Sequence, residues 1–494
     1  MKKHNLLKTI GIVFLIFVIL SWIIPVASFS SGELTKGTIK PVGLIDLVYY
    51  PLITMATFIQ YGIIILAIGG FYGVVNKTGV YSKLVDYLVK LAKKNEKRFL
   101  VIVISVLSLL ASLTGLPWAL FIAVPLLITV ILSLGFSKLT AIASTVGAIL
   151  VGMAGSTYGM SSGYSLYFLS LGVHTDILAK FVLLIILTFL LIMFVLSRTK
   201  KEVIETTSEE KTEGTKKGSK KTTATEKKTS EKVKVEKPLY EEKAGNKKSF
   251  WPLMIVIDLT ILILLVGTYN WYLTFKMTYF TDLYNSLSEI AIGDIPILSN
   301  ILGSSLTPLG YWGSYETALI IVIASLLLGW IYNIKFDEIL SSFGEGAKKV
   351  LKPALLVILA NVIFTIMINA QTGNIAITIT NYITGLSEGV NVFATTLASA
   401  FGSFFFNDFY YLLTNVMGPI QAAWTDVEFY SVLAIVFQSV HGLMLLFLPT
   451  SMILLAGLSL CDISYKDWLK YIWKFLIQVL AVILIVALIL SMLV

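Results

Sequence analysis

The chain has 494 residues, of which 56% are hydrophobic and 14% charged, and its formal net charge is +9 at pH 7. Apolar runs of about 20 residues, long enough to cross a bilayer, recur from end to end, which excludes a soluble globular protein and predicts an all-α polytopic membrane protein. The single cysteine, Cys461, excludes an intramolecular disulfide and a cysteine metal cluster, and the 3 histidines are too scattered for a metal site.

The first membrane repeat is expected to span residues 1–198, and its start is held in the cytoplasm by Lys2 and Lys3. Two apolar arms at about 99–134 are joined by an uncharged turn. We interpret them as a re-entrant hairpin whose tip stops inside the membrane; two full spans with a tight turn are the alternative. A broken transmembrane helix follows at about 139–171, where glycines interrupt the apolar run.

The middle of the chain changes in composition. Residues 199–249 are rich in Lys, Glu, Thr and Ser and poor in apolar residues, which predicts a disordered, charged cytoplasmic linker. The elements predicted after it are a linking transmembrane helix at 250–270, an outer loop at 271–316 and a second membrane repeat at 317–494, with a hairpin at about 390–420 and a broken helix at about 430–460.

Polar breaks occur in the same order in both halves. Ser112–Gly115 falls on Ser399–Gly402, and Gly155–Thr157 comes near Pro449–Ser451. Because the linking helix makes the second half start from the opposite side, we predict two inverted repeats, each with a re-entrant hairpin and a broken transmembrane helix. This places the N-terminus in the cytoplasm and the C-terminus outside. The alternative is a helical bundle with coincidental polar breaks.

The most specific motifs are Ser21–Pro25, Gly69–Gly79, Gln438, Gly442, Pro449–Ser451, Ala456–Leu458, Ile463, Tyr465 and Trp468. They resemble the DcuC-type C4-dicarboxylate anaerobic carriers of the ion transporter superfamily, in particular the YfcC-like branch. The resemblance implies a homodimeric, multi-pass carrier of the elevator type in the bacterial plasma membrane, driven by sodium or protons. It also implies binding sites at hairpin tips and broken helices, and basic amino acids or carboxylates as substrates.

The chain departs from that branch at the positions where carboxylates are expected. Trp118, Ala119 and Leu120 lie near the place of a glutamate pair, Phe405–Phe409 replaces a serine-glycine tip, and His441 replaces an aspartate. The loss of these carboxylates argues against basic amino acids as substrates. It predicts an apolar, aromatic cavity.

Hydroxyls and unwound backbone at the predicted breaks offer ligands made only of oxygen, which suit a hard monovalent cation such as sodium. The expected cation-binding residues are Ser112, Thr114, Gly115, Gly155, Ser156, Thr157, Ser403, Asn407, Thr450 and Ser451. The alternative is that each hydroxyl bonds a carbonyl of its own helix. A sodium ion or a proton would be the coupling ion, and no other cofactor or metal is expected.

The expected substrate-binding residues are Asp408, Gln438, His441 and Pro449. A carboxylate inside a membrane is a functional candidate by default, and a histidine can titrate near physiological pH. The alternatives are an aspartate at the surface and a histidine that is simply hydrogen-bonded. Because Arg98 and Arg198 are the only arginines and lie at predicted cytoplasmic helix ends, an anionic substrate would need helix N-termini, hydroxyls or a lysine.

These features predict a secondary active transporter that moves a small organic solute, either a carboxylate or an amino-acid or peptide-like molecule, by elevator-type alternating access. An intramembrane enzyme is the first alternative, but the sequence has no paired acidic motif or His/Glu metal-binding cluster. A channel is the second, but no charged ring or repeated filter is seen. The expected partners are the substrate, the lipid bilayer and a second copy of the chain, with no nucleic acid.

Overall fold

The computed structural model describes residues 6–30, 33–199, 248–292, 295–303, 307–369, 373–385, 391–423 and 426–494. Nearly all of the predicted linker at 199–249 lies outside these residues. The described part is mostly helical, as predicted for an all-α membrane protein. Within it, 8 helical segments are long and apolar enough to cross a membrane: Asp46–Lys77, Glu96–Thr114, Ile177–Ser197, Trp251–Thr268, Ser314–Ile331, Leu351–Asn369, Val427–Leu460 and Tyr465–Leu493.

The elements before the linker are α1 (Leu6–Ser21), β1 (Pro25–Ser30), β2 (Glu33–Ile39), α2 (Asp46–Lys77), α3 (Tyr81–Ala92), α4 (Glu96–Thr114), α5 (Pro117–Phe121), α6 (Val124–Ser133), α7 (Lys138–Ile142), η1 (Ala143–Gly147), α8 (Ala148–Ala154), α9 (Met160–Phe168) and α10 (Ile177–Ser197). Strands β1 and β2 form an antiparallel hairpin that the sequence did not predict, and Ala27 in β1 bridges to Asn374 in the second half.

The elements after the linker are α11 (Trp251–Thr268), α12 (Trp271–Phe275), α13 (Tyr279–Ser288), β3 (Ala291–Ile292), β4 (Ile295–Pro296), α14 (Ile297–Leu302), α15 (Ser314–Ile331), α16 (Phe336–Lys349), α17 (Leu351–Leu359), α18 (Val362–Asn369), α19 (Ile375–Thr384), α20 (Val392–Phe405), α21 (Phe409–Leu412), η2 (Leu413–Met417), α22 (Gly418–Ala423), η3 (Val427–Phe429), α23 (Tyr430–Phe447), α24 (Met452–Leu460) and α25 (Tyr465–Leu493).

Helix α2 packs against α15, α16 and α17, and α15 packs against α11; we call these five helices the frame group. Small residues let the backbones approach closely, as is usual where membrane helices pack. A Cβ at Gly73 of α2 would lie 2.1 Å from the Ser342 carbonyl oxygen of α16, so only glycine fits there. The frame group therefore joins a helix of the first half to helices of the second.

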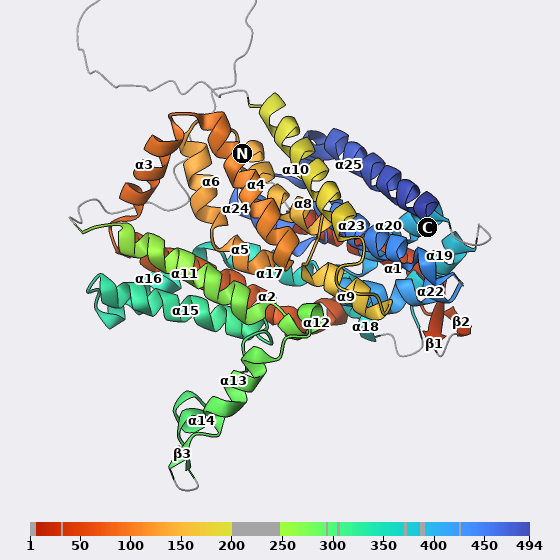
Figure 1. The fold of residues 1–494 in the computed structure, drawn as a ribbon, viewed down its shortest axis with the longest axis horizontal. Helices are drawn as coiled ribbons and strands as arrows, with labels where there is room; N and C mark the ends of the chain where they lie inside the picture. The colour runs from red at the N-terminus through yellow and green to blue at the C-terminus, as the bar shows by residue number, and fades with distance from the viewer. Residues whose placement is uncertain are drawn as a thin grey trace, which may run out of the picture.

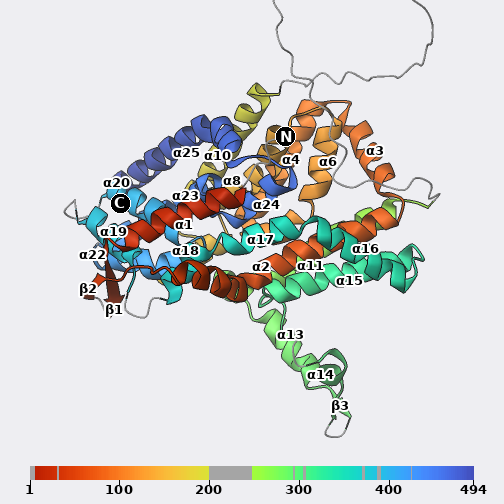
Figure 2. The same cartoon turned by 180° about the vertical axis from the view of Figure 1, so that it is seen from behind.

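Helices α4, α8, α10, α20, α23 and α25 pack together as a second set, which we call the core group. Here α8 crosses α23 so closely that a Cβ at Gly442 would lie 2.4 Å from the Ala154 Cα. Helix α24 packs against α17 and connects the two groups. Figures 1 and 2 show the frame group along one side of the body and the core group along the other.

A helical arm projects away from both groups (Figures 1 and 2). It consists of α13, the short β3–β4 hairpin and α14, and it is inserted between α11 and α15. The sequence predicted only an outer loop at 271–316. The structure shows helices there, while the side of the membrane on which they lie remains a prediction.

Candidate functional site

Four of the breaks between consecutive helices, two in each half of the described chain, surround the candidate site. The breaks lie at Gly115–Leu116 between α4 and α5, at Gly155–Gly159 between α8 and α9, at Phe406–Asp408 between α20 and α21, and at Leu448–Ser451 between α23 and α24. Gly115 has φ +67° at the end of α4, and a Cβ there would lie 2.6 Å from the Met160 amide of α9. The first two breaks are therefore in direct contact.

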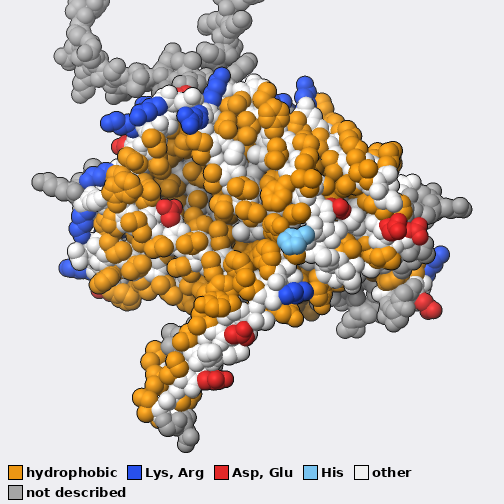
Figure 3. Space-filling view, viewed as in Figure 1, with side chains coloured by type: hydrophobic (Ala, Val, Ile, Leu, Met, Phe, Trp, Pro, Cys, Tyr) orange, Lys and Arg blue, Asp and Glu red, His pale blue; other side chains and the backbone are white. Residues whose placement is uncertain are grey.

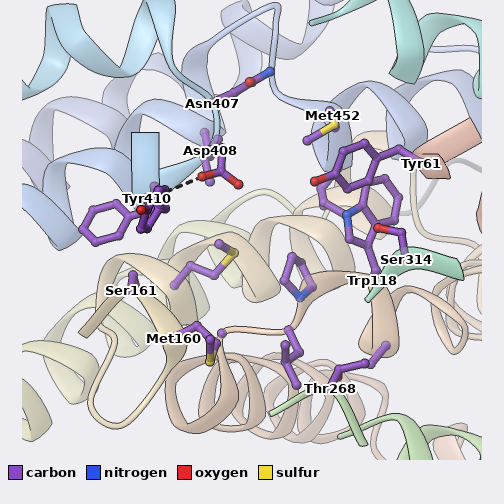
Figure 4. Close-up of a pocket in the computed structure, with 18 of the residues that line it drawn as sticks. Tyr61, Trp118, Met160, Ser161, Thr268, Ser314, Asn407, Asp408, Tyr410 and Met452 are labelled. Carbon is purple, nitrogen blue, oxygen red and sulfur yellow. Dashed lines mark hydrogen bonds between the residues drawn. The ribbon is translucent and has the colours of Figure 1, made fainter. Parts of the chain in front are cut away.

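A pocket of about 390 Å³ lies between these breaks and the frame group. Figure 4 shows Trp118, Met160, Ser161 and Tyr61 around it, with Asn407, Asp408, Tyr410 and Met452 from the second half and Thr268 and Ser314 from the frame group. The aromatic and thioether walls agree with the apolar, aromatic cavity expected from the sequence.

A buried group of polar residues lies outside the pocket lining. We call this group the first cluster, and it consists of Ser112, Gly155, Ser156, Thr157 and Gln438. The Ser112 hydroxyl donates to the Gly155 carbonyl (2.6 Å) and accepts from the Thr157 amide (3.1 Å). The Gln438 amide donates to the Ser156 carbonyl (2.8 Å), so the second half holds the break of the first. Most polar atoms of this cluster are thus bonded to one another, although Ser156 Oγ and Gln438 Oε1 have no partner in the described protein.

Asn407, Thr450 and Ser451 form the second cluster, at the two breaks of the second half. The Asn407 Nδ2 group donates to the Thr450 carbonyl (2.9 Å) and ties the two breaks together. Asn407 Oδ1, Thr450 Oγ1 and Ser451 Oγ are buried and have no hydrogen-bond partner among the described residues. Buried polar atoms are nearly always paired, so these unpaired oxygens, two of which belong to residues that line the pocket, are candidates for contact with a ligand.

Asp408 brings a carboxylate to the pocket wall. Its Oδ1 accepts from the amides of Tyr410 (3.0 Å) and Tyr411 (3.3 Å), which caps the start of α21 and fixes the side chain (Figure 4). Among the described residues that line the pocket, no lysine or arginine is present to pair with it. A ligand with a positive charge would supply the missing partner.

His441 is buried on α23 and lies at the edge of the pocket. Its Nδ1 is 3.2 Å from Ser403 Oγ, and Ser403 donates to the Ser399 carbonyl (2.8 Å). Because the Ser403 proton is used in that bond, His441 Nδ1 is the donor to Ser403. The imidazole also packs against Phe409, with ring centres 5.2 Å apart.

The structure places five of the predicted site residues on the pocket wall: Gly115, Asn407, Asp408, His441 and Ser451. Seven others do not line the pocket and take part instead in the hydrogen bonds described above: Ser112, Gly155, Ser156, Thr157, Ser403, Gln438 and Thr450. Thr114 bonds the Leu110 carbonyl of its own helix (2.7 Å), the alternative considered for each hydroxyl. Pro449 lies in the unwound segment between α23 and α24 and does not line the pocket. Cation and substrate roles for all these residues stay predictions.

Sequence reasoning missed the frame side of the pocket, which Tyr61, Thr268 and Ser314 supply. These residues lie in ordinary apolar spans and carry no local signal. It also missed Ser161 and Tyr164 on α9. Ser161 is the second residue of α9, just after the Gly155–Gly159 break, and its buried hydroxyl has no partner within the described structure, so the break itself was the available signal.

The fold and the site together define a multi-pass helical membrane protein with an internal pocket built from breaks in both halves. The family model of the C4-dicarboxylate anaerobic carriers, DcuC, matches residues 5–493, and the chain belongs to this family. It is therefore a membrane transporter.

A curated relative is YfcC of Escherichia coli (strain K12), whose name proposes it as a basic amino acid antiporter. The chain is 28% identical to it over 155 residues, which are 29% of this chain and 30% of that protein. Two solved structures are also similar. The Alcanivorax borkumensis YdaH transporter has a TM-score of 0.38 and 11% identity, covering 98% of this chain and 97% of that one. Neisseria gonorrhoeae MtrF, placed among antimetabolite efflux pumps, has a TM-score of 0.33 and 13% identity, covering 99% and 94%.

Proposed function

We propose that this protein is a secondary active transporter for a small solute that combines an amine with an apolar part, such as an amino acid or a peptide-like molecule. The observation that carries the proposal is Asp408, a capped carboxylate on a largely apolar and aromatic pocket wall. Two carboxylates of a dicarboxylate would meet a like charge here. An amine would pair with Asp408, and an apolar group would contact Trp118 and Tyr61.

We further propose that sodium is the coupling ion and that it binds at the second cluster. Asn407 Oδ1, Thr450 Oγ1 and Ser451 Oγ supply hard oxygen ligands that make no hydrogen bond to any described residue. Since Asn407 and Ser451 also line the pocket, a bound ion would touch the space that holds the substrate. Each ligand would then raise the affinity for the other by the same factor.

For the transport cycle we propose an elevator in which the core group moves against the frame group. Each of the two groups contains helices from both halves of the chain. The pocket is lined by residues of the core group and of the frame group. The proposal includes two inverted repeats with re-entrant hairpins, a cytoplasmic N-terminus, an outer C-terminus and a homodimer in the bacterial plasma membrane. Midplane sites at broken helices are common in transporters with inverted repeats.

The test is uptake by the full chain in liposomes, with sodium and proton gradients imposed separately. Radiolabelled neutral amino acids, lysine and succinate are compared at equal concentration, and empty liposomes are the control. We expect saturable, sodium-dependent uptake of an apolar amino acid. Uptake of succinate alone would overturn the substrate proposal, uptake driven only by protons would overturn the sodium site, and current that does not saturate would indicate a channel.

A further inference from the structure

The arm has an apolar face that no described part of the protein covers. On α13, Tyr279 and Leu283 are 62% and 40% exposed, and Ile290 just beyond the helix is also exposed. At the tip, Ile292 and Ile295 are exposed, as is Ile301 on α14. The apolar arc continues around α13: Phe280, Tyr284 and Leu287 line a groove together with Trp312, and Leu283 lies both at this groove and at the exposed surface.

The polar residues of α13 lie on a different arc of the helix from the apolar ones. Asp282, Asn285 and Glu289 are exposed; at 3.6 residues per turn Asn285 falls opposite Leu283, whereas Asp282 and the exposed Ser286 border Tyr279. Figure 3 shows the same division: hydrophobic side chains follow one edge of the arm and the acidic ones the other. The hydrophobic edge is on the side where α15 and α16 lie in the matching view of Figure 1.

The root of the arm is fixed at one end of two membrane helices, since α11 ends at Thr268 and α15 begins at Ser314. The Gly310 and Trp312 amides both donate to the Gly267 carbonyl (2.7 and 3.1 Å), which clamps the two ends of the insertion together. Exposed tyrosines surround this root: Tyr272, Tyr311 and Tyr315. Exposed tyrosines are typical of the level where a membrane meets water.

We infer that the arm lies on the lipid surface at this face of the membrane, with Tyr279, Leu283, Ile290 and Ile301 inserted at the boundary between headgroups and acyl chains. In Figures 1 and 2 the arm leaves α11 and α15 at a steep angle, so it runs along a membrane that those helices cross. In this placement its apolar face is turned toward the bilayer, and α15, next to the root of the arm, also exposes apolar residues, Leu319 and Ile323. An amphipathic element at this level buries its apolar side in lipid and keeps its acidic side in water.

This placement of the arm does not depend on the substrate or on the coupling ion. The arm would anchor the frame group at a fixed depth in the membrane, because α11 and α15 both belong to that group. The side of the membrane follows from the proposed topology, which places the ends of these two helices outside.

The experiment places one cysteine at a time in a Cys461→Ser background of the full chain and labels it with bimane. Leu283→Cys reports on the apolar face and Asn285→Cys, on the other side of the same helix, is the matched control. Leu319→Cys on α15 is the reference for a lipid-facing position. The labelled proteins are reconstituted in phosphatidylcholine liposomes, and quenching by spin-labelled lipid is compared with quenching by iodide in the water.

We expect the lipid quencher to act at least about twofold more strongly on position 283 than on 285, and iodide to show the reverse order. Ile301→Cys repeats the test on α14 if the Leu283 variant does not fold. Equal, strong iodide quenching at 283 and 285 would overturn the inference and leave the arm in water. Protection of 283 from both quenchers, with disulfide cross-linking between copies, would also overturn it and assign the face to a second copy of the chain.

Discussion

The first and second clusters both lie at helix breaks, one in each half of the chain, yet their polar atoms are used differently. In the first cluster, the Ser112 hydroxyl joins Gly155 and Thr157 with bonds of 2.6 and 3.1 Å. In the second, a single bond from Asn407 to the Thr450 carbonyl spans the breaks, and three side-chain oxygens remain without partners in the described residues. The first cluster also keeps two oxygens without partners among the described residues, Ser156 Oγ and Gln438 Oε1, but neither residue lines the pocket. Asn407 and Ser451 of the second cluster do line it, and in this sense we call the first cluster closed and the second open.

The difference suggests two roles: the first cluster holds its helix breaks together, and the second cluster binds a ligand at its breaks. A buried hydrogen bond inside a membrane protein contributes modestly to stability, whereas a buried polar atom without a partner costs free energy until a ligand satisfies it. The comparison therefore predicts that variants of the first cluster change stability and that variants of the second change ligand binding.

The largest effect is expected at Asp408, beside the open cluster. Asp408→Asn should lower substrate uptake by about 10–100-fold, since a charge-assisted bond contributes about 1.5–3 kcal/mol. Asparagine caps a helix about as well as aspartate, so the free energy of unfolding should change by less than about 0.5 kcal/mol. Uptake in liposomes and thermal unfolding in detergent are measured on the same preparations.

The matched control for Asp408 is Asp86→Asn on α3, which removes an exposed carboxylate far from the pocket lining. Its uptake should equal that of the unmodified protein. Normal uptake by Asp408→Asn would show that the substrate does not need this charge, and the amine proposal would fail.

In the closed cluster, the expected change is in stability. Ser112→Ala removes the donor to Gly155 and one acceptor of the Thr157 amide, and it should lower the free energy of unfolding by roughly 1–2 kcal/mol. Ser451→Ala makes the same chemical change to a hydroxyl without a described partner and should be nearly neutral. Unfolding is followed by tryptophan fluorescence at fixed detergent. Equal destabilisation by both substitutions would remove the distinction between the clusters.

Much of the fold could be predicted from the sequence because membrane spans depend on length and apolar composition alone. The breaks at Gly115, Gly155–Gly159 and Pro449–Ser451 were visible as small and polar residues within apolar runs. The β1–β2 hairpin and the helices of the arm were not predicted. The β1–β2 hairpin pairs with a distant residue through the bridge between Ala27 and Asn374, which no local pattern records.

The site was predictable only in part, for the same reason. Asp408 and His441 stand out in the sequence as ionisable groups in apolar surroundings, and both line the pocket. Tyr61 and Ser314 come from ordinary spans and reach the pocket only through the packing of the frame group. Which hydroxyls are already bonded, as in Ser112, and which have no partner among the described residues, as in Ser451, depends on tertiary distances of a few tenths of an ångström.

Binding of the coupling ion at the open cluster is tested most directly by the sodium dependence of uptake. The concentration of sodium that gives half-maximal uptake is measured in liposomes at fixed membrane potential and pH for Ser451→Ala and Ser112→Ala. We predict that it rises by about 3–10-fold in Ser451→Ala, the loss of one ligand that contributes roughly 1 kcal/mol, and stays unchanged in Ser112→Ala. An unchanged value in Ser451→Ala together with a raised value in Ser112→Ala would contradict the claim and place the ion at the first cluster.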